Sequence, residues 1–359
     1  MKVGIVHTAF FGDLVQLGLL IEGLYLSGHE VFLISNRRAL MLYDTDVRIK
    51  KIILINKGRG IGKLVKIFSN VRIINELGLD FLLVPHRSAQ SSLMSYFCNC
   101  PVKIGFSSAH FGFLFTDVIP WNLDVHECVR YFELGRKSLI AREVSANLLA
   151  NPLPFLRAKN KLTEFKKSYT EFDELKTEYF ILSPGSVWAT KIYPPDLMLK
   201  CVGMILNSSP NMNCIVSGGP EDYPVIAKFM NFVSDLEIGT RERILDASRC
   251  LPVGELLELM RNAKFSLSAD SGPFHMAIGV QAPALGIYGP TSSVSGMGPI
   301  GINAAAVSLA DQDGKLLSCQ PCGAHGAKAC PLQHHKCMRL LDPATVFAAV
   351  KKLVPNSFV

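Results

Sequence analysis

The fold of this chain is decided by residues 266–291, which read SLSADSGPFHMAIGVQAPALGIYGPT. Residues 265–268, in which Phe265 and Leu267 alternate with serines, are interpreted as a short buried strand. Residues 284–288 form an apolar run of strand length, and small apolar residues at 276–280 separate the two segments. A strand, a helix and a second strand in this order are typical of a parallel α/β sheet. The stretch therefore predicts an open parallel sheet whose ligand loops lie at the carboxyl ends of the strands.

The turn from the first of these strands into the helix consists of Asp270, Ser271 and Gly272. Pro273 suits the first helical turn, where its missing N–H costs nothing. A helix N-terminus with small neighbours offers free backbone N–H groups and the positive end of the helix dipole, so it suits a phosphate group. Residues 289–291 form a second tight turn at the same edge of the sheet.

Length and composition indicate a soluble protein of two domains. The chain has 359 residues, of which 49% are hydrophobic and 19% charged. No apolar run approaches the roughly 18 residues that a membrane span needs. Asp13 and Glu22 interrupt the first apolar stretch, which therefore does not resemble a signal peptide. We expect a cytoplasmic protein, in which the 10 cysteines are thiols or metal ligands rather than disulfides.

The formal net charge of +7 arises from the first 160 residues. Basic residues are concentrated between Asn36 and Asn75, where the acids are Asp44, Asp46 and no others. The basic residues there are Arg37, Arg38, Arg48, Lys50, Lys51, Lys57, Arg59, Lys63, Lys66 and Arg72. Such a field favours an anionic partner, which could be nucleic acid, an acidic membrane surface or an acidic substrate. The alternative is an ordinary solvated surface.

Two series of alternating strands and helices run along the chain. The predicted strands are Val3–Val6, Val31–Ser35, Ile52–Ile55, Phe81–Val84 and Val102–Phe106 in the first series, and Tyr179–Leu182, Asn213–Ser217, Phe265–Ser268 and Ala284–Tyr288 in the second. One helix is expected over Leu14–Leu26, and residues 158–178 are interpreted as the join between two domains. We therefore expect two doubly wound sheets with an active cleft between them, at the carboxyl ends of the strands.

The loop after the first strand carries a candidate catalytic base. Asp13 follows Gly12 just beyond that strand, where a carboxylate would face the cleft and could deprotonate an acceptor hydroxyl. The alternative role for Asp13 is to cap the helix that follows.

The loops after the first two predicted strands of the second series suit a phosphorylated ligand. Residues 183–194 read SPGSVWATKIYP, in which Ser186 offers a hydroxyl and a backbone N–H and Lys191 a positive charge. Residues 217–222 read SGGPED, whose paired glycines allow close approach of a ligand to the backbone. Glu221 and Asp222 end this segment.

The C-terminal part contains four cysteines in the pattern Cys-x2-Cys-x7-Cys-x6-Cys, namely Cys319, Cys322, Cys330 and Cys337. Four thiolates with a leading Cys-x2-Cys pair can form a tetrahedral structural site for zinc or iron. The alternative is a compact loop of packed thiols. The other six cysteines show no ligand spacing and are expected in the core.

The sequence Asp-Ser-Gly-x-x-His, followed by a small-residue helix and Tyr-Gly-Pro-Thr, resembles the donor-site signature of the lipopolysaccharide heptosyltransferases of glycosyltransferase family 9. The resemblance extends to Gly12-Asp13, to the Ser186–Lys191 loop and to the cysteine-rich tail. His7 replaces the lysine that is commoner in the family's first loop, and the family's usual His and Pro further along the next helix are absent.

The resemblance implies a GT-B fold, in which two Rossmann-like domains face each other across a cleft. Residues 1–160 would bind the acceptor and residues 161–359, with the Cys-rich tail, the nucleotide-sugar donor. It implies transfer of heptose, with inversion, from ADP-L-glycero-D-manno-heptose to the inner core of lipopolysaccharide, either Kdo-lipid A or its heptosylated form. No Asp-x-Asp pair appears in the site loops, so no metal or other cofactor is expected in catalysis.

The resemblance also distributes the site residues. Asp13 and Lys191 would be catalytic, and Gly12, Arg59 and Lys63 would bind the anionic acceptor. The donor would be bound by Ser186, Lys191, Glu221, Asp270, Ser271, Gly272 and His275. In the family an acidic residue in the loop of Glu221 contacts the nucleoside ribose or the sugar of the donor, and Asp222 is the other candidate for that contact. No nucleic-acid partner is implied, and peripheral contact with the cytoplasmic face of the inner membrane is expected.

Two other functions remain compatible with the residues. A nucleotide-sugar epimerase on the same fold would change its donor without an acceptor. A non-catalytic module would use the cysteine-rich tail to dock a partner, and Asp13 and Lys191 would then be dispensable. An NAD-dependent oxidoreductase is disfavoured because no Gly-x-Gly-x-x-Gly follows the first strand.

Overall fold

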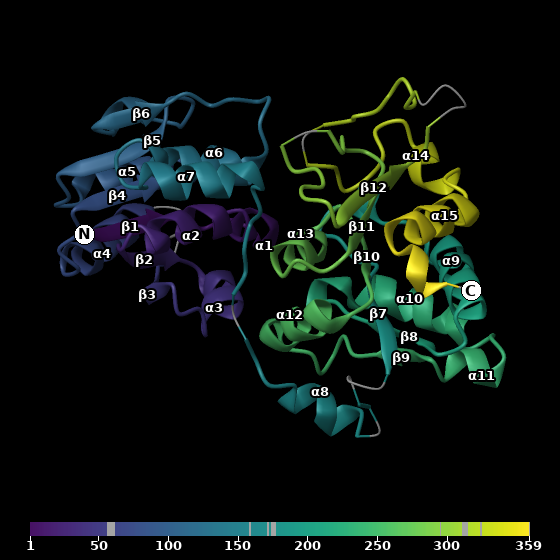
Figure 1. The fold of residues 1–359 in the computed structure, drawn as a ribbon. Coiled ribbons are helices and arrows are strands. Elements are labelled where there is room, and N and C mark those ends of the chain that lie inside the picture. The colour runs from purple at the N-terminus through teal and green to yellow at the C-terminus, as the bar shows by residue number, and fades with distance from the viewer. Residues whose placement is uncertain are drawn as a thin grey trace. The chain divides into compact units, whose positions relative to one another are not determined.

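The computed structural model describes residues 1–55, 62–157, 159–170, 172–173, 177–294, 296–310, 315–323 and 325–358, without the side chains of residues 62–64. The chain divides into two compact units, Met1–Ala158 and Lys159–Val359. Unit 1 is coloured purple to blue and unit 2 teal to yellow in Figure 1. Each unit contains one six-stranded sheet among its described residues.

The sheet of unit 1 is parallel throughout, in the order β3-β2-β1-β4-β5-β6. Its strands are β1 (Lys2–Val6), β2 (Glu30–Ser35), β3 (Ile49–Leu54), β4 (Phe81–Val84), β5 (Val102–Phe106) and β6 (Asp117–Ile119). The five predicted strands are confirmed. The short β6 was not predicted, because an exposed edge strand of three residues carries no apolar run.

The helices of unit 1 are α1 (Phe11–Val15), α2 (Gly18–Leu26), α3 (Arg37–Tyr43), α4 (Gly62–Asn75), α5 (Ala89–Phe97), α6 (Glu127–Arg136) and α7 (Arg142–Ala150), with a 3₁₀ turn η1 (Gly112–Leu114). The prediction of one helix over Leu14–Leu26 was wrong, since α1 ends at Val15 and α2 begins at Gly18. A Cβ atom on Gly18 would collide with the backbone of Phe155. The close approach of this distant segment was not visible in the local sequence.

The sheet of unit 2 is also parallel throughout, in the order β12-β11-β10-β7-β8-β9. Followed from β9 to β12, this order has the same topology as the sheet of unit 1. Its strands are β7 (Glu178–Ser183), β8 (Met212–Val216), β9 (Ile244–Asp246), β10 (Ser266–Ala269), β11 (Ala284–Tyr288) and β12 (Ala304–Ser308). Its helices are α8 (Thr163–Ser168), α9 (Pro195–Ser208), α10 (Tyr223–Val233), α11 (Ile238–Arg241), α12 (Val253–Asn262), α13 (Gly272–Gly279), α14 (Lys336–Arg339) and α15 (Pro343–Leu353), with 3₁₀ turns η2 (Ala189–Lys191), η3 (Pro220–Asp222) and η4 (Pro355–Ser357). The four predicted strands are confirmed, whereas β9 and β12 were not predicted.

The segment interpreted as a join is partly a packed element of unit 2. Residues 163–168 form α8, and the Phe165 side chain is fully buried. The carboxylate of Glu255, on α12, accepts backbone N–H groups of Glu164 and Phe165 at 2.9 Å each. These bonds satisfy orphan donors of the first helical turn, so α12 caps α8.

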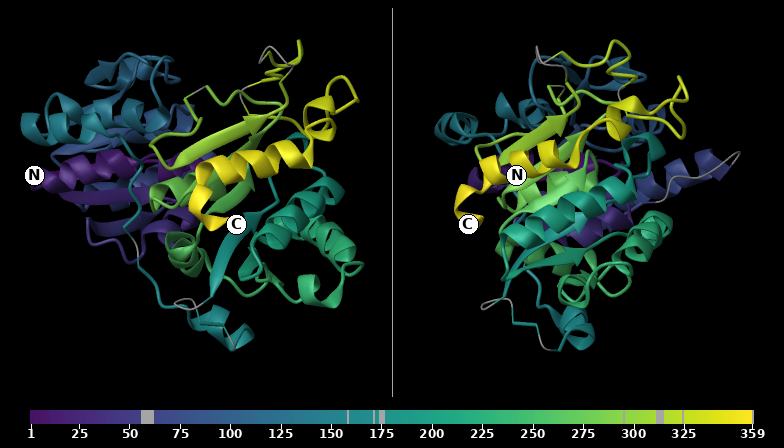
Figure 2. Two further views of the ribbon diagram at one scale, coloured as in Figure 1. Left: turned by 45° about the vertical axis from the view of Figure 1, so that its right-hand side comes forward. Right: turned by 90° about the vertical axis from the view of Figure 1, so that its right-hand side faces the viewer.

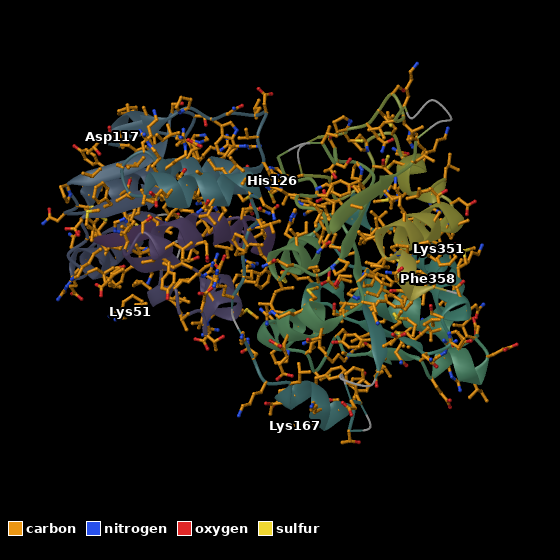
Figure 3. All side chains as sticks on the ribbon, in the orientation of Figure 1. Lys51, Asp117, His126, Lys167, Lys351 and Phe358 are labelled. Atoms are coloured by element: carbon orange, nitrogen blue, oxygen red, sulfur yellow. The ribbon has the colours of Figure 1, made fainter. Side chains whose placement is uncertain are left out.

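The core of unit 2 lies between its sheet and the helices around it. Phe180 and Phe265 stack on neighbouring strands with ring centroids 4.8 Å apart. The yellow helix α15 runs beside β12 and β11 (Figure 2). Phe358, labelled in Figure 3, packs its ring edge-on against Phe347 of α15. Five of the six cysteines expected in the core are buried, and Cys250 is half-buried.

The predicted α/β class with two doubly wound parallel sheets is confirmed. In each sheet the chain starts in the centre, builds one half and then crosses over to build the other. The two switch points lie between β1 and β4 in unit 1 and between β7 and β10 in unit 2. The loops after these four strands are therefore where a ligand site is expected in each unit. Among the described residues, no helix is both long and apolar enough to cross a bilayer.

Candidate active site

The switch point of unit 2 brings predicted donor residues from two loops into contact. Lys191 ends η2 in the loop after β7, and Asp270 follows β10 directly. The ammonium Nζ of Lys191 lies 2.6 Å from Oδ2 of Asp270, and the two side chains are only 11% and 7% exposed. The hydroxyl of Thr291, in the loop after β11, donates to the same carboxylate oxygen at 2.6 Å.

This arrangement assigns different roles to the two charged residues. Asp270 already accepts two strong hydrogen bonds at one oxygen, so it fixes the lysine and the threonine. The Lys191 ammonium has further N–H groups to donate. The Asp270 carboxylate partly cancels the positive potential of the lysine. An anion of higher charge, such as a diphosphate, would still be attracted to the ammonium group.

The N-terminus of α13 stands directly beside this ion pair. Ser271 is the N-cap residue and Gly272 the first helical residue, with Pro273 in the first turn as predicted. The Ser271 hydroxyl donates to the carbonyl of Ala269 at 3.3 Å, which fixes the turn. In the neighbouring loop the Ser186 hydroxyl accepts the backbone N–H of Trp188 at 3.3 Å. Both predicted serines therefore shape their loops and retain oxygen atoms for a ligand.

His275 lies inside the protein, on the second turn of α13. It is 3% exposed and its ring packs against Phe274. Burial, opposed by the negative charge of Asp270 and assisted by the positive charge of Lys191, lowers the pKa of its imidazole to about 4. His275 is therefore a neutral residue behind the Lys191–Asp270 pair. Its predicted contact with the donor stays a prediction.

The acidic residues after β8 differ in their surroundings. Asp222 accepts the backbone N–H of Gly219 at 2.9 Å, and burial raises the pKa of its carboxyl. A Cβ on Gly185 would collide with the Asp222 carboxyl, so Asp222 packs tightly beside the loop after β7. Glu221 is exposed. Of the two candidates, Glu221 is the carboxylate available to a ligand.

In unit 1, Asp13 lies in α1, beyond the carboxyl end of β1. Its Oδ2 accepts the backbone N–H of Phe10 at 3.3 Å, so the capping role is present. Its negative charge also contributes to the raised pKa values of Glu127 and Tyr131, where burial is the main cause. Asp13 therefore lies close to the first turns of α6.

A set of residues around Asp13 was not predicted from the sequence. His7 Nε2 lies 3.0 Å from the hydroxyl of Tyr131, and the rings of His7 and His86 are 5.2 Å apart. Glu127 pairs with Arg130 at 2.7 Å. His86 follows β4 and could have been found by the switch-point rule, whereas Glu127 and Tyr131 belong to a helix that no local motif marks.

Two guanidinium groups stack on one indole ring in this part of unit 1. Arg87 and Arg130 lie over Trp121, with 3.9 and 4.6 Å from guanidinium carbon to ring centroid. Arg87 is exposed, and it forms no ion pair with any residue that the structure describes. An exposed guanidinium held flat on a ring can bind a carboxylate or phosphate group.

The predicted acceptor residues are only partly described. Gly12 is buried inside α1. Arg59 lies outside the described residues, and Lys63 belongs to α4 by its backbone while its side chain is not described. The prediction that Arg48 belongs to the basic stretch is corrected by the structure. Its guanidinium is fully buried and pairs with Asp46 and Glu22 at 2.5 and 2.8 Å. It contributes nothing to a basic surface.

Cys319, Cys322 and Cys330 lie in the segment between β12 and α14, and Cys337 lies in α14 itself. The thiols of Cys319, Cys322 and Cys330 each contribute to raising the pKa of Cys337 to about 11, although burial is the main cause. Yet nowhere in the described chain do three or more His, Cys, Asp or Glu side chains come together in a way that could hold a metal ion. The geometry therefore does not support the predicted structural zinc or iron.

Comparison with known proteins gives a consistent family assignment. The sequence profile described as glycosyltransferase family 9 (heptosyltransferase) matches residues 68–322. Lipooligosaccharide heptosyltransferase 2 of Campylobacter jejuni serotype O:2 is 36% identical over 91 residues, which are 25% of this chain and only 26% of that protein.

Solved structures of similar fold cover nearly the whole chain. The family 9 glycosyl transferase of Veillonella parvula superposes with a TM-score of 0.81 at 16% identity, over 99% of this chain and 98% of that one. The E. coli ADP-heptose lps heptosyltransferase II gives a TM-score of 0.74 at 16% identity, over 99% of both chains. The GT-B fold class is thereby confirmed.

Proposed function

This chain belongs to glycosyltransferase family 9, and on that premise we propose that it transfers heptose from ADP-L-glycero-D-manno-heptose to the inner core of lipopolysaccharide. The acceptor is Kdo-lipid A or its heptosylated form. Two relatives whose names state heptosyltransferase activity support the sugar. The name of the E. coli relative includes ADP-heptose, which supports the nucleotide.

The observation that carries the proposal is the Lys191–Asp270–Thr291 cluster at the switch point of unit 2. A buried lysine beside a helix N-terminus suits a diphosphate better than a neutral ligand, because both carry positive electrostatic potential. When the bond to the sugar breaks, negative charge increases on the diphosphate. Donors already fixed in place lower the barrier to that step without reorganisation.

Asp13 serves as the general base in this proposal. It takes the proton of the acceptor hydroxyl while that oxygen attacks the anomeric carbon and ADP leaves from the opposite face. The configuration at that carbon is therefore inverted. Lys191, Ser186, Ser271 and Gly272 stabilise the departing diphosphate, and Glu221 contacts the nucleoside or sugar. No metal ion takes part in this mechanism.

Unit 1 binds the acceptor in this proposal. The inner core is acidic and phosphorylated, and Arg87 on Trp121 offers an exposed guanidinium near the residues around Asp13. Gly12, Arg59 and Lys63 remain proposed acceptor residues from the sequence. The arginine adds a residue that does not depend on the resemblance.

The acceptor carries a lipid, so the protein would work at the cytoplasmic face of the inner membrane. Its contact surface would be the α4–α5 face, which we define as Val65, Lys66, Phe68, Arg72, Tyr96 and Phe97. Phe68, Tyr96 and Phe97 are 53%, 50% and 44% exposed. The rings of Phe68 and Phe97 lie 5.2 Å apart. Exposed aromatic rings with basic neighbours favour the interface of an anionic bilayer.

A direct assay tests the proposed reaction. Purified protein is incubated with ADP-heptose and a set of lipopolysaccharides truncated at defined inner-core positions, and the products are read by mass spectrometry. We expect one heptose to be added to one truncated form, with release of ADP. Conversion of the donor alone, without an acceptor product, would instead identify an epimerase.

A further inference from the structure

The cysteine-rich tail makes specific contacts with the proposed donor site. We define the cysteine strap as residues 315–323 and 325–339. It leaves β12, has no regular structure before α14, and returns to the sheet through α15. Its hydrogen bonds join two loops that lie on either side of the Lys191–Asp270 pair.

The first of these loops is the one that carries Lys191. The backbone N–H of Thr190 donates to the carbonyl of Ala327 at 3.1 Å. The Thr190 hydroxyl donates to the same carbonyl at 3.0 Å and accepts the N–H of Ala327 at 2.8 Å. His335 Nε2 lies 2.7 Å from the carbonyl of Thr190 and donates to it. Three groups of Thr190, its N–H, its hydroxyl and its carbonyl, are thus hydrogen-bonded to the strap.

The strap also contacts the stem of Lys191. Gly326 adopts φ +79°, a left-handed conformation that favours glycine. A Cβ there would stand 3.2 Å from Cγ of Lys191 and 3.2 Å from the Thr190 hydroxyl oxygen. The strap backbone therefore packs against the aliphatic part of the lysine without space for a side chain.

The second loop joined by the strap is residues 289–291. The side-chain amide of Gln320 donates to the carbonyl of Gly289 at 2.6 Å, and the N–H of Cys322 donates to the carbonyl of Pro290 at 2.7 Å. The next residue is Thr291, whose hydroxyl binds Asp270. The strap therefore fixes both Lys191 and Thr291 relative to the carboxylate between them.

We propose that Thr190 is a positioning residue for the nucleotide diphosphate: through Ala327 of the cysteine strap, its hydroxyl holds the Lys191 ammonium where the donor binds. This inference rests on the proposed function of Lys191. Its basis is that a buried hydroxyl satisfies both backbone groups of one strap residue. Loss of that hydroxyl leaves the Ala327 N–H without this partner, although the Ala327 carbonyl keeps the N–H of Thr190. An unsatisfied donor in this part-buried site is costly.

The test measures ADP binding by isothermal titration calorimetry and steady-state kinetics on the full chain. Thr190→Val keeps the shape of the side chain and removes the hydroxyl, whereas Thr190→Ser keeps the hydroxyl. We expect Thr190→Val to weaken ADP binding roughly tenfold. The KM for the acceptor should be unchanged, and Thr190→Ser should bind ADP like the wild type.

A second pair of variants keeps the test decisive if Thr190→Val does not fold. Gly326→Ala places a methyl group against Lys191 and Thr190, whereas Gly323→Ala, on the same strap, has no atom within 4 Å of the new Cβ. We expect Gly326→Ala to weaken ADP binding and Gly323→Ala to leave it unchanged.

The possible results separate this inference from the proposed function. If the wild type binds ADP and Thr190→Val and Gly326→Ala bind it equally well, the positioning role is refuted and the proposed function stands. Equal loss of ADP and acceptor affinity, without rescue by Thr190→Ser, would also refute it and indicate general destabilisation. A wild type that does not bind ADP would overturn both.

Discussion

The Lys191 ammonium lies 2.6 Å from the Asp270 carboxylate, across the strand pair β7–β10 where the chain order of the second sheet reverses. The two residues are 79 positions apart in the sequence. Asp270 follows β10 directly, and Lys191 ends the 3₁₀ turn η2 in the loop after β7. The geometry of the pair therefore depends on the parallel pairing of β7 with β10.

Replacement of Lys191 by methionine should impair both stability and chemistry. The variant keeps the aliphatic stem but leaves Asp270 without its cation, which should cost on the order of 3 kcal/mol of unfolding free energy. Loss of a charge aimed at the leaving group should lower kcat roughly hundredfold. Urea denaturation, ADP titration and single-turnover rates measure these effects.

The double variant Lys191→Met/Asp270→Asn is the matched control for that experiment. It removes both charges, so stability should return towards the wild-type value while turnover stays low. If turnover recovers together with stability, the effect of Lys191 is structural and the lysine does not act on the diphosphate.

Asp13→Asn should lower kcat roughly hundredfold or more, because an amide cannot take the acceptor proton. The asparagine oxygen can still accept the Phe10 N–H, so the cap and the thermal midpoint should be preserved. ADP affinity should also be unchanged, as should the KM for the donor. Turnover near the wild-type rate would assign the base to another residue, with His86 and Glu127 the next to replace.

The buried His275 should make the free energy of unfolding depend on pH. Its folded pKa is about 4, below the unfolded value of 6.5. Below pH 6.5 the unfolded chain therefore takes up a proton that the folded chain does not, so stability falls as the pH drops from 6.5 to 4. The shift corresponds to about 3 kcal/mol at most.

His275→Gln isolates this contribution, because glutamine stays neutral throughout. The unfolding free energy of the wild type, minus that of the variant, should decrease steadily between pH 6.5 and 4 and be constant above pH 7. Urea titrations at half-unit intervals of pH measure this difference. Parallel curves for the two proteins would mean that the imidazole titrates normally in the folded state.

The sequence was sufficient for the central strands and for the residues that follow them. Strands in parallel sheets are buried on both faces and read as mainly apolar segments. Asp270 and Ser271 directly follow one such segment, and Lys191 lies in the loop after another. The short strand β9 and the alanine-rich β12 give no such signal, since alanine favours helices.

Contacts between distant segments account for the other failures. Glu255 caps α8 from about 90 positions away, and the α2–α6 packing that brings Tyr131 to His7 has no local signature. The Cys-x2-Cys spacing suggested a metal, whereas the strap that carries it is bound to donor loops through Thr190 and Gln320. Spacing alone does not reveal which surface a loop packs against.

The α4–α5 face should mediate binding to anionic membranes. Phe68→Ser/Phe97→Ser removes the two neighbouring rings, and Lys66→Glu/Arg72→Glu reverses charges that contribute about 1 kcal/mol each near an anionic surface. Both variants should bind less to vesicles containing anionic phospholipid, as measured by co-sedimentation. Of the two, only the charge-reversal variant should lose the dependence of vesicle binding on salt concentration. Activity on a delipidated acceptor should not change, because neither pair belongs to the proposed site.

The matched control for the aromatic pair is Phe232→Ser, on α10 of unit 2, where the phenylalanine is similarly exposed at 41%. Phe232→Ser should bind vesicles like the wild type, because the loss of an exposed ring outside the α4–α5 face should not weaken membrane binding. The physical reason is local: burial of Phe68 and Phe97 in the interface requires that basic neighbours reach the lipid headgroups at the same time. Equal vesicle binding by all three variants would exclude this face and require a different membrane contact.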